Sequence, residues 1–379
     1  MVEMQATDFD LAGFVRVRVI GGQSDTDAVA RQLGLPRSTA SGDPDVTVVF
    51  DPTMEPSGPL RFLGYEDAAY DDEDFFVLRA KSKARALVRI PFGDVGRNVT
   101  VTCHPGLPAV PLLIPLLAVT ALNRGLVPLH AGALSWNGSG IVVTGWSKGG
   151  KTETLLAATE AGARYVGDEW CYIDPGAGRV VGIPEPVTLW AWHLRRFPPV
   201  RGVVPLGDRA RMALLDGPDR LERRLPGVVQ RSSVGRMFRR VAYQLRLRAN
   251  AWVSPTTLFG VTDAASVPFE HVVLVTSVSV DDVTIQPTAA SDIAARMAHS
   301  VRYELEPLMR AYEMYRFAFP DRRSEALDRL DRDLDVAIHE GLDQRVGWTL
   351  QHPYELDLRR LADALREVLS HDPVQDLKL

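Results

Sequence analysis

The sequence predicts an α/β protein in three parts: a β-rich N-terminal domain over residues 1–107, a central domain over 127–290, and a helical C-terminal region over 291–379. Three observations lead to this fold class. The first part contains short runs of β-branched and aromatic residues between turn clusters. The central part alternates strand and helix patterns around a glycine-rich loop, and the last part repeats apolar residues at helical spacing.

The composition is that of a folded protein with two or three domains. The chain has 379 residues, of which 46% are hydrophobic and 24% charged, and its net charge is -5. Its two cysteines, Cys103 and Cys171, lack the spacing of a zinc site or of a disulfide framework. Such cysteine usage is typical of a reducing compartment, so we expect a cytoplasmic protein.

No membrane segment is expected. Residues 1–14 lack the basic start and apolar stretch of a signal peptide. The most apolar stretch, residues 108–122, contains two prolines and is shorter than the roughly 18 residues of a bilayer span. We expect a buried helix here, within a connecting segment over 108–126, and a helix end where Gly125 adopts a left-handed conformation.

Five stretches of the N-terminal domain alternate or run in β-branched and aromatic residues, and no catalytic motif is visible among them. They are FVRVRVI (14–20), DVTVVFD (45–51), FFVLRAK (75–81), ALVRIPF (86–92) and NVTVTC (98–103). Turn clusters such as SGDPD separate them. We therefore expect a mainly β domain without chemistry of its own.

The central domain opens on a phosphate-binding loop. GWSKGGKT meets the pattern G-x-x-x-x-G-K-[ST] with Gly145, Gly150, Lys151 and Thr152. An apolar strand pattern precedes the loop and a helix pattern follows it, which is the context the motif requires. We expect the loop amides and Lys151 to bind the phosphates of ATP, and the Thr152 hydroxyl to face Mg²⁺.

An acidic pair follows the loop closely. YVGDE places Asp168 and Glu169 sixteen and seventeen residues after Thr152, with one predicted helix and one short strand between them. A strand that returns beside the first one brings these carboxylates to the phosphate end of the sheet.

Three motifs together, LHAGAL, GWSKGGKTET and ARYVGDE, resemble the catalytic domain of HPr kinase/phosphorylase. His130 stands fifteen residues before Gly145, as the histidine of that family does. Ser147 falls on the loop serine and Glu153 on the glutamate after Lys-Ser, while Asp168 and Glu169 fall on the acidic pair of the family. The resemblance covers about residues 127–190 and implies a P-loop fold related to that of the phosphoenolpyruvate carboxykinases.

The resemblance implies a role for each matching residue. Asp168 would take a proton from an attacking hydroxyl, Lys151 would stabilise the transferred phosphoryl group, and His130 would lie near Asp168 and tune or relay the proton. The residues implied to bind ATP are Gly145, Ser147, Lys148, Gly149, Gly150, Lys151, Thr152 and Glu153, and those implied to hold Mg²⁺ are Thr152, Asp168 and Glu169. For Lys148 a phosphate contact and a solvated loop position both stay open.

A looser resemblance, in layout only, links the chain to HPr-kinase-like proteins with a β-rich front and a helical tail, some of which phosphorylate a serine of a lasso-peptide precursor. The stretch GIPEPVTL (182–189) resembles the short strand that those proteins carry after the acidic pair. The chain departs from HPr kinase at Glu169, Trp146 and Lys148 and lacks the phosphorylase signature. A back-reaction and the phosphocarrier substrate therefore stay open.

An arginine-rich insertion is expected over residues 195–250. Residues 195–248 hold fourteen arginines and four acids, a local charge of about +10 in an acidic protein. Arg195, Arg196 and Arg201 are the candidates for contact with ATP, an acidic peptide or an anionic metabolite, and solvated helix faces are the alternative. Nucleic acid is disfavoured by the pI of about 5.9 and by the lack of interleaved aromatic residues.

Two strands are expected to close the central domain, at 269–280 and 282–287, and helices to follow. Apolar residues at helical spacing mark two of those helices: Leu327, Leu330, Leu334 and Ile338, then Leu358, Leu361, Leu365 and Leu369. The function expected is an ATP-dependent kinase acting on a hydroxyl of a peptide, protein or small molecule. The alternative is a regulatory ATP-binding protein or ATPase that acts through its terminal domains, and homo-oligomer formation is left open.

Overall fold

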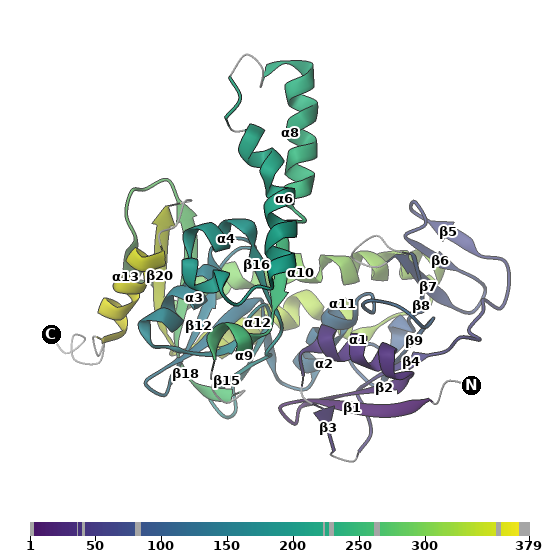
Figure 1. Ribbon diagram of the computed structural model, residues 1–379. Helices are drawn as coiled ribbons and strands as arrows, with labels where there is room; N and C mark the ends of the chain where they lie inside the picture. Colours follow the sequence, from purple (N-terminus) through teal and green to yellow (C-terminus); the bar gives the residue numbers. More distant parts are fainter. Residues whose placement is uncertain are drawn as a thin grey trace.

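The computed structural model describes residues 4–35, 37–39, 42–79, 85–222, 224–226, 231–260, 266–353 and 358–370. It is a mixed α/β structure with two large sheets, as the sequence predicts. Figure 1 shows the N-terminal sheet on one side, the central sheet on the other, and the long helix α10 (Ala290–Ala318) running from one to the other. A pair of helices projects from the central part into solvent.

Within the described residues the N-terminal part forms a nine-stranded sheet, and the five predicted strands are confirmed. In spatial order its members are β3 (Arg37–Ser38), β1 (Gln5–Leu11), β2 (Val15–Gly21), β4 (Val46–Phe50), β9 (Val99–Cys103), β8 (Arg85–Arg89), β7 (Phe75–Arg79), β6 (Ala68–Tyr70) and β5 (Arg61–Leu63). A short 3-10 helix, η1 (Phe92–Asp94), precedes β9.

The expectation of a mainly β front misses one helix, α1 (Gln23–Leu33). The helix buries Val29 and Leu33 and ends at Gly34, whose φ of 63° is left-handed and whose N–H donates to the carbonyl of Ala30. Few large apolar residues mark α1, so its helical period is weak in the sequence.

The central sheet carries the glycine-rich loop that the sequence predicts to bind phosphate (the phosphate loop). Its strands, in spatial order, are β10 (Val127–Leu129), β14 (Cys171–Asp174), β15 (Arg179–Gly182), β18 (Ser266–Val278), β12 (Ser139–Thr144), β11 (Ala131–Trp136) and β13 (Arg164–Gly167), with β20 (Val346–Pro353) beside β18 and β19 (Thr284–Pro287) beside β20. β12, β18 and β20 are parallel neighbours, so their carboxyl ends meet at one edge. The tight turn between β11 and β12 has positive φ at Asn137 and Gly138, as a two-residue hairpin requires.

Strand β20 corrects the expectation that residues 291–379 are only helical. Its alternating Val346, Trp348 and Leu350 resemble a strand pattern, but the leucine-rich helices on both sides dominate the region. The helices there are α10, α11 (Glu325–Asp328), α12 (Leu330–Leu342) and α13 (Leu358–Ser370). The predicted apolar residues from Leu327 to Ile338 and from Leu358 to Leu365 are buried, whereas the side chain of Leu369 lies outside the described residues.

The two sheets share one hydrophobic core. It runs from the N-terminal sheet through α2 (Leu113–Asn123), α10 and α12 to the central sheet. Helix α2 is the predicted buried helix, and the helix end at Gly125 has the expected positive φ of 90°. A bilayer span needs a longer apolar helix than any in the described part of the chain.

The arginine-rich insertion is helical in its described residues and stands on a small two-stranded sheet. The elements of this part are β16 (Val187–Trp190), α4 (Ala191–Arg196), α5 (Pro198–Arg201), α6 (Leu206–Glu222), α8 (Ser233–Arg246), β17 (Asn250–Val253) and α9 (Pro255–Phe259). Helix α3 (Lys151–Ala161) follows the phosphate loop, as predicted, and packs against α13.

Candidate active site

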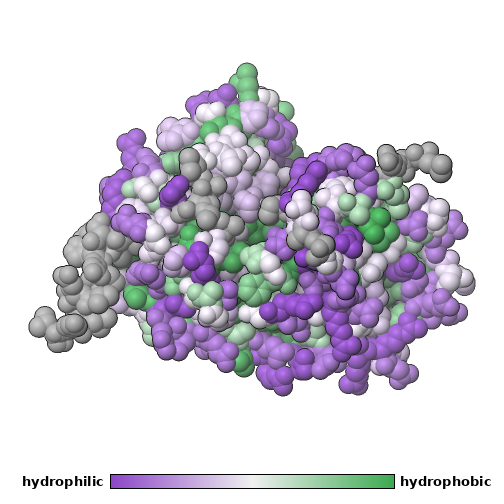
Figure 2. Space-filling view, turned by 90° about the horizontal axis from the view of Figure 1, so that it is seen from below, coloured by the Kyte–Doolittle hydropathy of each residue, from purple (hydrophilic) through white to green (hydrophobic). Residues whose placement is uncertain are grey.

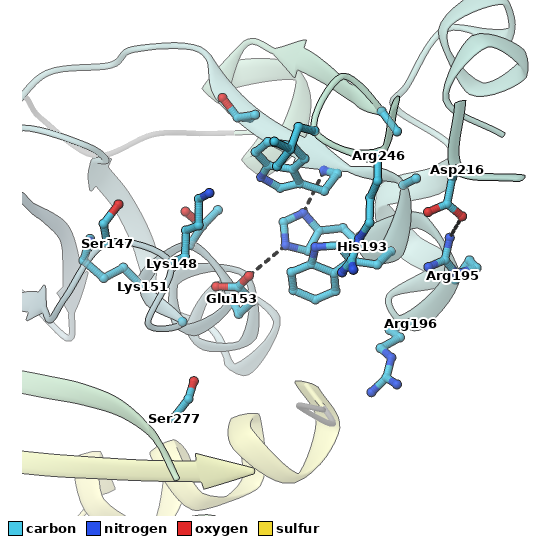
Figure 3. Close-up of a pocket in the computed structure, with 18 of the residues that line it drawn as sticks. Ser147, Lys148, Lys151, Glu153, His193, Arg195, Arg196, Asp216, Arg246 and Ser277 are labelled. Carbon is cyan, nitrogen blue, oxygen red and sulfur yellow. Dashed lines mark hydrogen bonds and ion pairs between the residues drawn. The ribbon is translucent and has the colours of Figure 1, made fainter. Parts of the chain in front are cut away.

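The loop between β12 and α3, which the sequence predicts to bind phosphate, needs glycine at two positions. Gly145 and Gly150 have φ of 153° and 108°, values that favour glycine. A Cβ on Gly145 would lie 2.5 Å from the carbonyl oxygen of Val275 on β18, so the loop also needs glycine for space. Lys148 is exposed with φ of 62°, and it lines the same hollow as Ser147 and Lys151 (Figure 3).

Lys151 is buried at the start of α3. Its Nζ donates to the carbonyl oxygens of Gly145 and Trp146, both at 3.3 Å. Burial lowers the pKa of Lys151, and the charges of nearby carboxylates, led by Glu169 and Asp168, oppose that shift. A cation held inside the loop in this way is placed to meet phosphate oxygens.

Asp168 and the loop meet at Thr152. The Thr152 hydroxyl donates to Asp168 Oδ2 at 3.1 Å, and the backbone N–H of Glu169 donates to Asp168 Oδ1 at 2.9 Å. Burial, followed by the charge of Glu169, raises the pKa of Asp168 to about 7. A carboxylate that binds a proton near neutral pH suits a general base.

His130 is buried between two glutamates. Its Nε2 lies 3.2 Å from Glu169 Oε2, and its Nδ1 lies 3.3 Å from Glu304 Oε1 on α10. The resemblance implies a place beside Asp168. His130 lies beside the next residue, Glu169, and lines the same cavity as Asp168. Its other neighbour, Glu304, is marked by no sequence motif.

Glu153, implied to bind nucleotide, is joined to the arginine-rich insertion. Its Oε1 accepts from His193 Nε2 at 2.9 Å, and His193 Nδ1 accepts from the backbone N–H of Trp190 at 3.0 Å (Figure 3). Because Nδ1 accepts, the ring hydrogen lies on Nε2. Burial is the largest single effect on the pKa of Glu153 and raises it. The hydrogen bond from His193 and the further interactions with His193, the backbone N–H of Glu153 and His352 together exceed it, so the net shift is downward. This pair ties α4 to the first turn of α3.

Helix α10 supports the loop from behind. Ser300 donates to the Gly145 carbonyl at 3.3 Å, and Thr144 contacts the sulfur of Met297. Trp146 of the loop and Tyr303 of α10 are both about half exposed, with ring centroids 4.9 Å apart. The helical expectation for this region was right, but its contact with the loop was not foreseeable from local sequence.

His352, at the end of β20, holds the other side of the loop. Its Nε2 lies 3.0 Å from the Gly149 carbonyl oxygen and 3.3 Å from Ser277 Oγ. A Cβ on Gly150 would lie 2.4 Å from the same nitrogen. The C=O of Gly149 and the N–H of Gly150 belong to the same trans peptide bond and point to opposite sides. Because the Gly149 carbonyl faces His352, the Gly150 N–H points away from it.

A cavity of about 690 Å³ joins the loop to the base of the insertion. From the loop side it is lined by His130, Ser147, Lys148, Gly150, Lys151, Thr152, Glu153, Asp168, Glu169, Ser277, Glu304 and His352. Side chains of the insertion line the other side, among them Trp192, Arg195, Arg196, Arg220, Tyr243 and Arg246. Of the three arginines expected to contribute, Arg195 and Arg196 line the cavity and the described, exposed Arg201 does not.

The oxygen atoms near the loop fit Mg²⁺. The Thr152 hydroxyl and the Asp168 carboxylate already touch, and Glu169 is the next residue. Mg²⁺ prefers oxygen ligands and is commonly held by one or two carboxylates with phosphates and water. The described residues contain no cluster of three or more His, Cys, Asp or Glu that could hold a metal ion.

Two comparisons with known proteins give no match. No protein-family model matches the chain, and a search of curated proteins finds no significant match. The function of the protein is therefore inferred from the residues of the cavity.

The raised pKa of Asp168 predicts a pH-dependent stability in the absence of nucleotide and Mg²⁺. The folded protein keeps this proton up to about pH 7, whereas the unfolded chain releases it near 3.8. The free energy of unfolding should therefore fall as pH rises from 3.8 to about 7. Asp168→Asn removes this titration. The Tm of the variant minus the Tm of wild type should therefore be higher at pH 8 than at pH 5, by about a few degrees. A Tm difference that is the same at both pH values would contradict the buried, protonated carboxyl.

His352 predicts a second effect, on nucleotide affinity. His352→Ala removes the ring whose Nε2 lies 3.0 Å from the Gly149 carbonyl oxygen, and one hydrogen bond of about 0.5–1.5 kcal/mol corresponds to roughly 2- to 12-fold weaker ATP binding. His352→Gln, which keeps an N–H donor, should lose less. Calorimetric titration with ATP measures this, with the exposed His299→Ala as control. Equal affinities for wild type and His352→Ala would show that the loop does not need this support.

Proposed function

We propose that this protein is an ATP-dependent kinase that transfers the γ-phosphoryl group to a hydroxyl acceptor. The observation that carries the proposal is the contact between Thr152 and Asp168, which joins a phosphate-binding loop to a buried carboxyl group of raised pKa. A protein that only senses nucleotide does not need such a base beside its loop. The shared cavity leaves space beyond the loop for an acceptor.

Each residue then has a defined task. The loop amides and Lys151 bind and orient the phosphates of ATP, and Asp168 accepts the proton of the acceptor hydroxyl. The acceptor oxygen forms a bond to the γ-phosphorus while the bond from that phosphorus to the β,γ-bridging oxygen breaks. The electron pair of the broken bond stays on the β-phosphate of ADP. His130 keeps the neighbouring Glu169 in place through its 3.2 Å contact.

Mg²⁺, held by Thr152, Asp168 and Glu169, would neutralise charge on the phosphates when bound. The order of His130, loop and acidic pair along the chain supports an HPr-kinase-like catalytic domain. The parallel arrangement of β12, β18 and β20, with the loop at their carboxyl edge, is compatible with such a domain.

The test is the fate of the phosphoryl group in a mixture of acceptors. The protein is incubated with ATP, Mg²⁺, serine-containing peptides and hydroxylated metabolites, and the products are separated by mass spectrometry. A kinase yields a phosphorylated acceptor in an ATP-dependent manner. Release of free phosphate without any phosphorylated acceptor would favour the regulatory ATPase instead.

A further inference from the structure

Helices α6 and α8 form an arm that projects from the molecule (Figure 1). They run antiparallel, because Glu222 of α6 pairs with Arg239 at 2.8 Å while Asp219, one turn earlier, pairs with Arg246 at 3.7 Å. The buried Asp216 is shared by Arg195 and Arg220, which fixes the arm to α4. The arm is therefore an ordered part of the fold that extends well beyond the core.

Both helices of the arm carry exposed apolar residues. Val234, Met237 and Val241 repeat at helical spacing on α8 and are 72%, 67% and 51% exposed. Leu214 and Leu221 of α6, seven residues apart, are 77% and 56% exposed. Figure 2 views the molecule from below, from the end away from the arm, where hydrophilic residues dominate with small hydrophobic groups between them. Apolar residues gathered on a projecting element are typical of a protein-binding surface.

The charge of the arm favours an acidic partner. Residues 195–248 carry about +10, whereas the rest of the chain carries about -15. Arg236 and Arg240 are exposed on α8 beside the apolar row. Two arms would repel one another, so arm-to-arm pairing of two copies is disfavoured, and an acidic partner is favoured.

The arm also leads into the catalytic cavity. Arg220, Tyr243 and Arg246 at its base line the same cavity as Lys151 and Asp168. A small molecule in the cavity would not reach Val234 or Met237 near the far end of α8. An extended polypeptide bound along α8 would reach both.

We propose that the arm is a docking site for an acidic, amphipathic segment of a polypeptide acceptor. Its apolar side chains would pack on Val234, Met237 and Val241, and its carboxylates would pair with Arg236 and Arg240. A hydroxyl-bearing residue further along the same polypeptide would then enter the cavity. This last step rests on the proposed kinase function, whereas the docking site does not.

The test uses a display library of random 20-residue peptides selected on the full chain. The best peptide is then titrated by fluorescence anisotropy against wild type, Arg240→Glu and the double variant Met237→Glu/Val241→Glu. The matched control is Val336→Glu, at a 50% exposed valine of α12. Circular dichroism and calorimetric titration with ATP show whether each variant is folded and binds nucleotide.

The proposal expects enrichment of acidic peptides with apolar residues at helical spacing. It also expects at least tenfold weaker binding by both arm variants, with the control and ATP affinity unchanged. It is overturned by enrichment without acidic character, by equal binding of all variants, by tighter binding of a labelled oligonucleotide than of any peptide, or by a dimer that Met237→Glu/Val241→Glu dissociates. Docking of the peptide, together with no transfer of phosphate to any acceptor in the mixture above, would refute the kinase function and leave the docking site standing.

Discussion

Asp168→Asn should lower the rate of phosphoryl transfer by about 10²- to 10⁴-fold, the usual contribution of a general base. The amide keeps the size of the side chain and can still contact Thr152, but it does not accept the hydroxyl proton. ATP should still bind, because Lys151 and the loop amides are unchanged and the amide oxygen of asparagine can also coordinate Mg²⁺. Single-turnover kinetics with labelled ATP and an acceptor from the mixture above measures the rate.

The control for this substitution is Asp281→Asn, at an exposed aspartate far from the loop in sequence. It should transfer phosphate at the wild-type rate. If Asp168→Asn lost ATP binding to the same extent as transfer, the carboxylate would serve nucleotide binding and not proton transfer.

Lys151→Met should weaken ATP binding by roughly 10- to 150-fold, the equivalent of about 1.5–3 kcal/mol for hydrogen bonds to a charged group. Methionine has nearly the same length and tolerates the buried position, so the fold should persist. Calorimetric titration with ATP and Mg²⁺ measures the affinity, and circular dichroism checks the fold.

Lys148→Asn is the matched control, since asparagine tolerates the positive φ of 62° at this position. Lys148 is exposed, so its loss should weaken ATP binding by no more than about fivefold, the range of exposed ion pairs. A larger effect for Lys148 than for Lys151 would mean that the exposed lysine is the principal phosphate ligand.

Local motifs predicted the parts of the site that lie close together in sequence. The loop from Gly145 to Thr152 has its strand before it and its helix after it, and Asp168 follows after one further helix and strand. Each of these steps has a local signal, namely glycine positions, helical period and strand pattern. The structure accordingly brings Lys151, Thr152 and Asp168 into one cavity.

The other residues that line or support the site come from distant segments and carry no local signal. Glu304 and Ser300 lie on a long amphipathic helix, where the sequence does not distinguish them from the other polar residues. His352 lies on β20, the strand whose sequence pattern is weak beside the leucine-rich helices that precede and follow it. His193 follows the acidic pair by more than twenty residues and meets Glu153 only because α4 packs beside α3. Such contacts depend on the order of strands in the sheet, which hydrophobic periodicity does not specify.

The central claim is that the phosphate loop and Asp168 act on the same γ-phosphoryl group. The most direct measurement follows the label of γ-labelled ATP in wild type and in Asp168→Asn, and separates labelled acceptor from free phosphate. Wild type should place the label on an acceptor hydroxyl, and Asp168→Asn should bind ATP and leave the acceptor unlabelled. Equal labelling of the acceptor by both proteins, or label found only in free phosphate with both, would contradict the account.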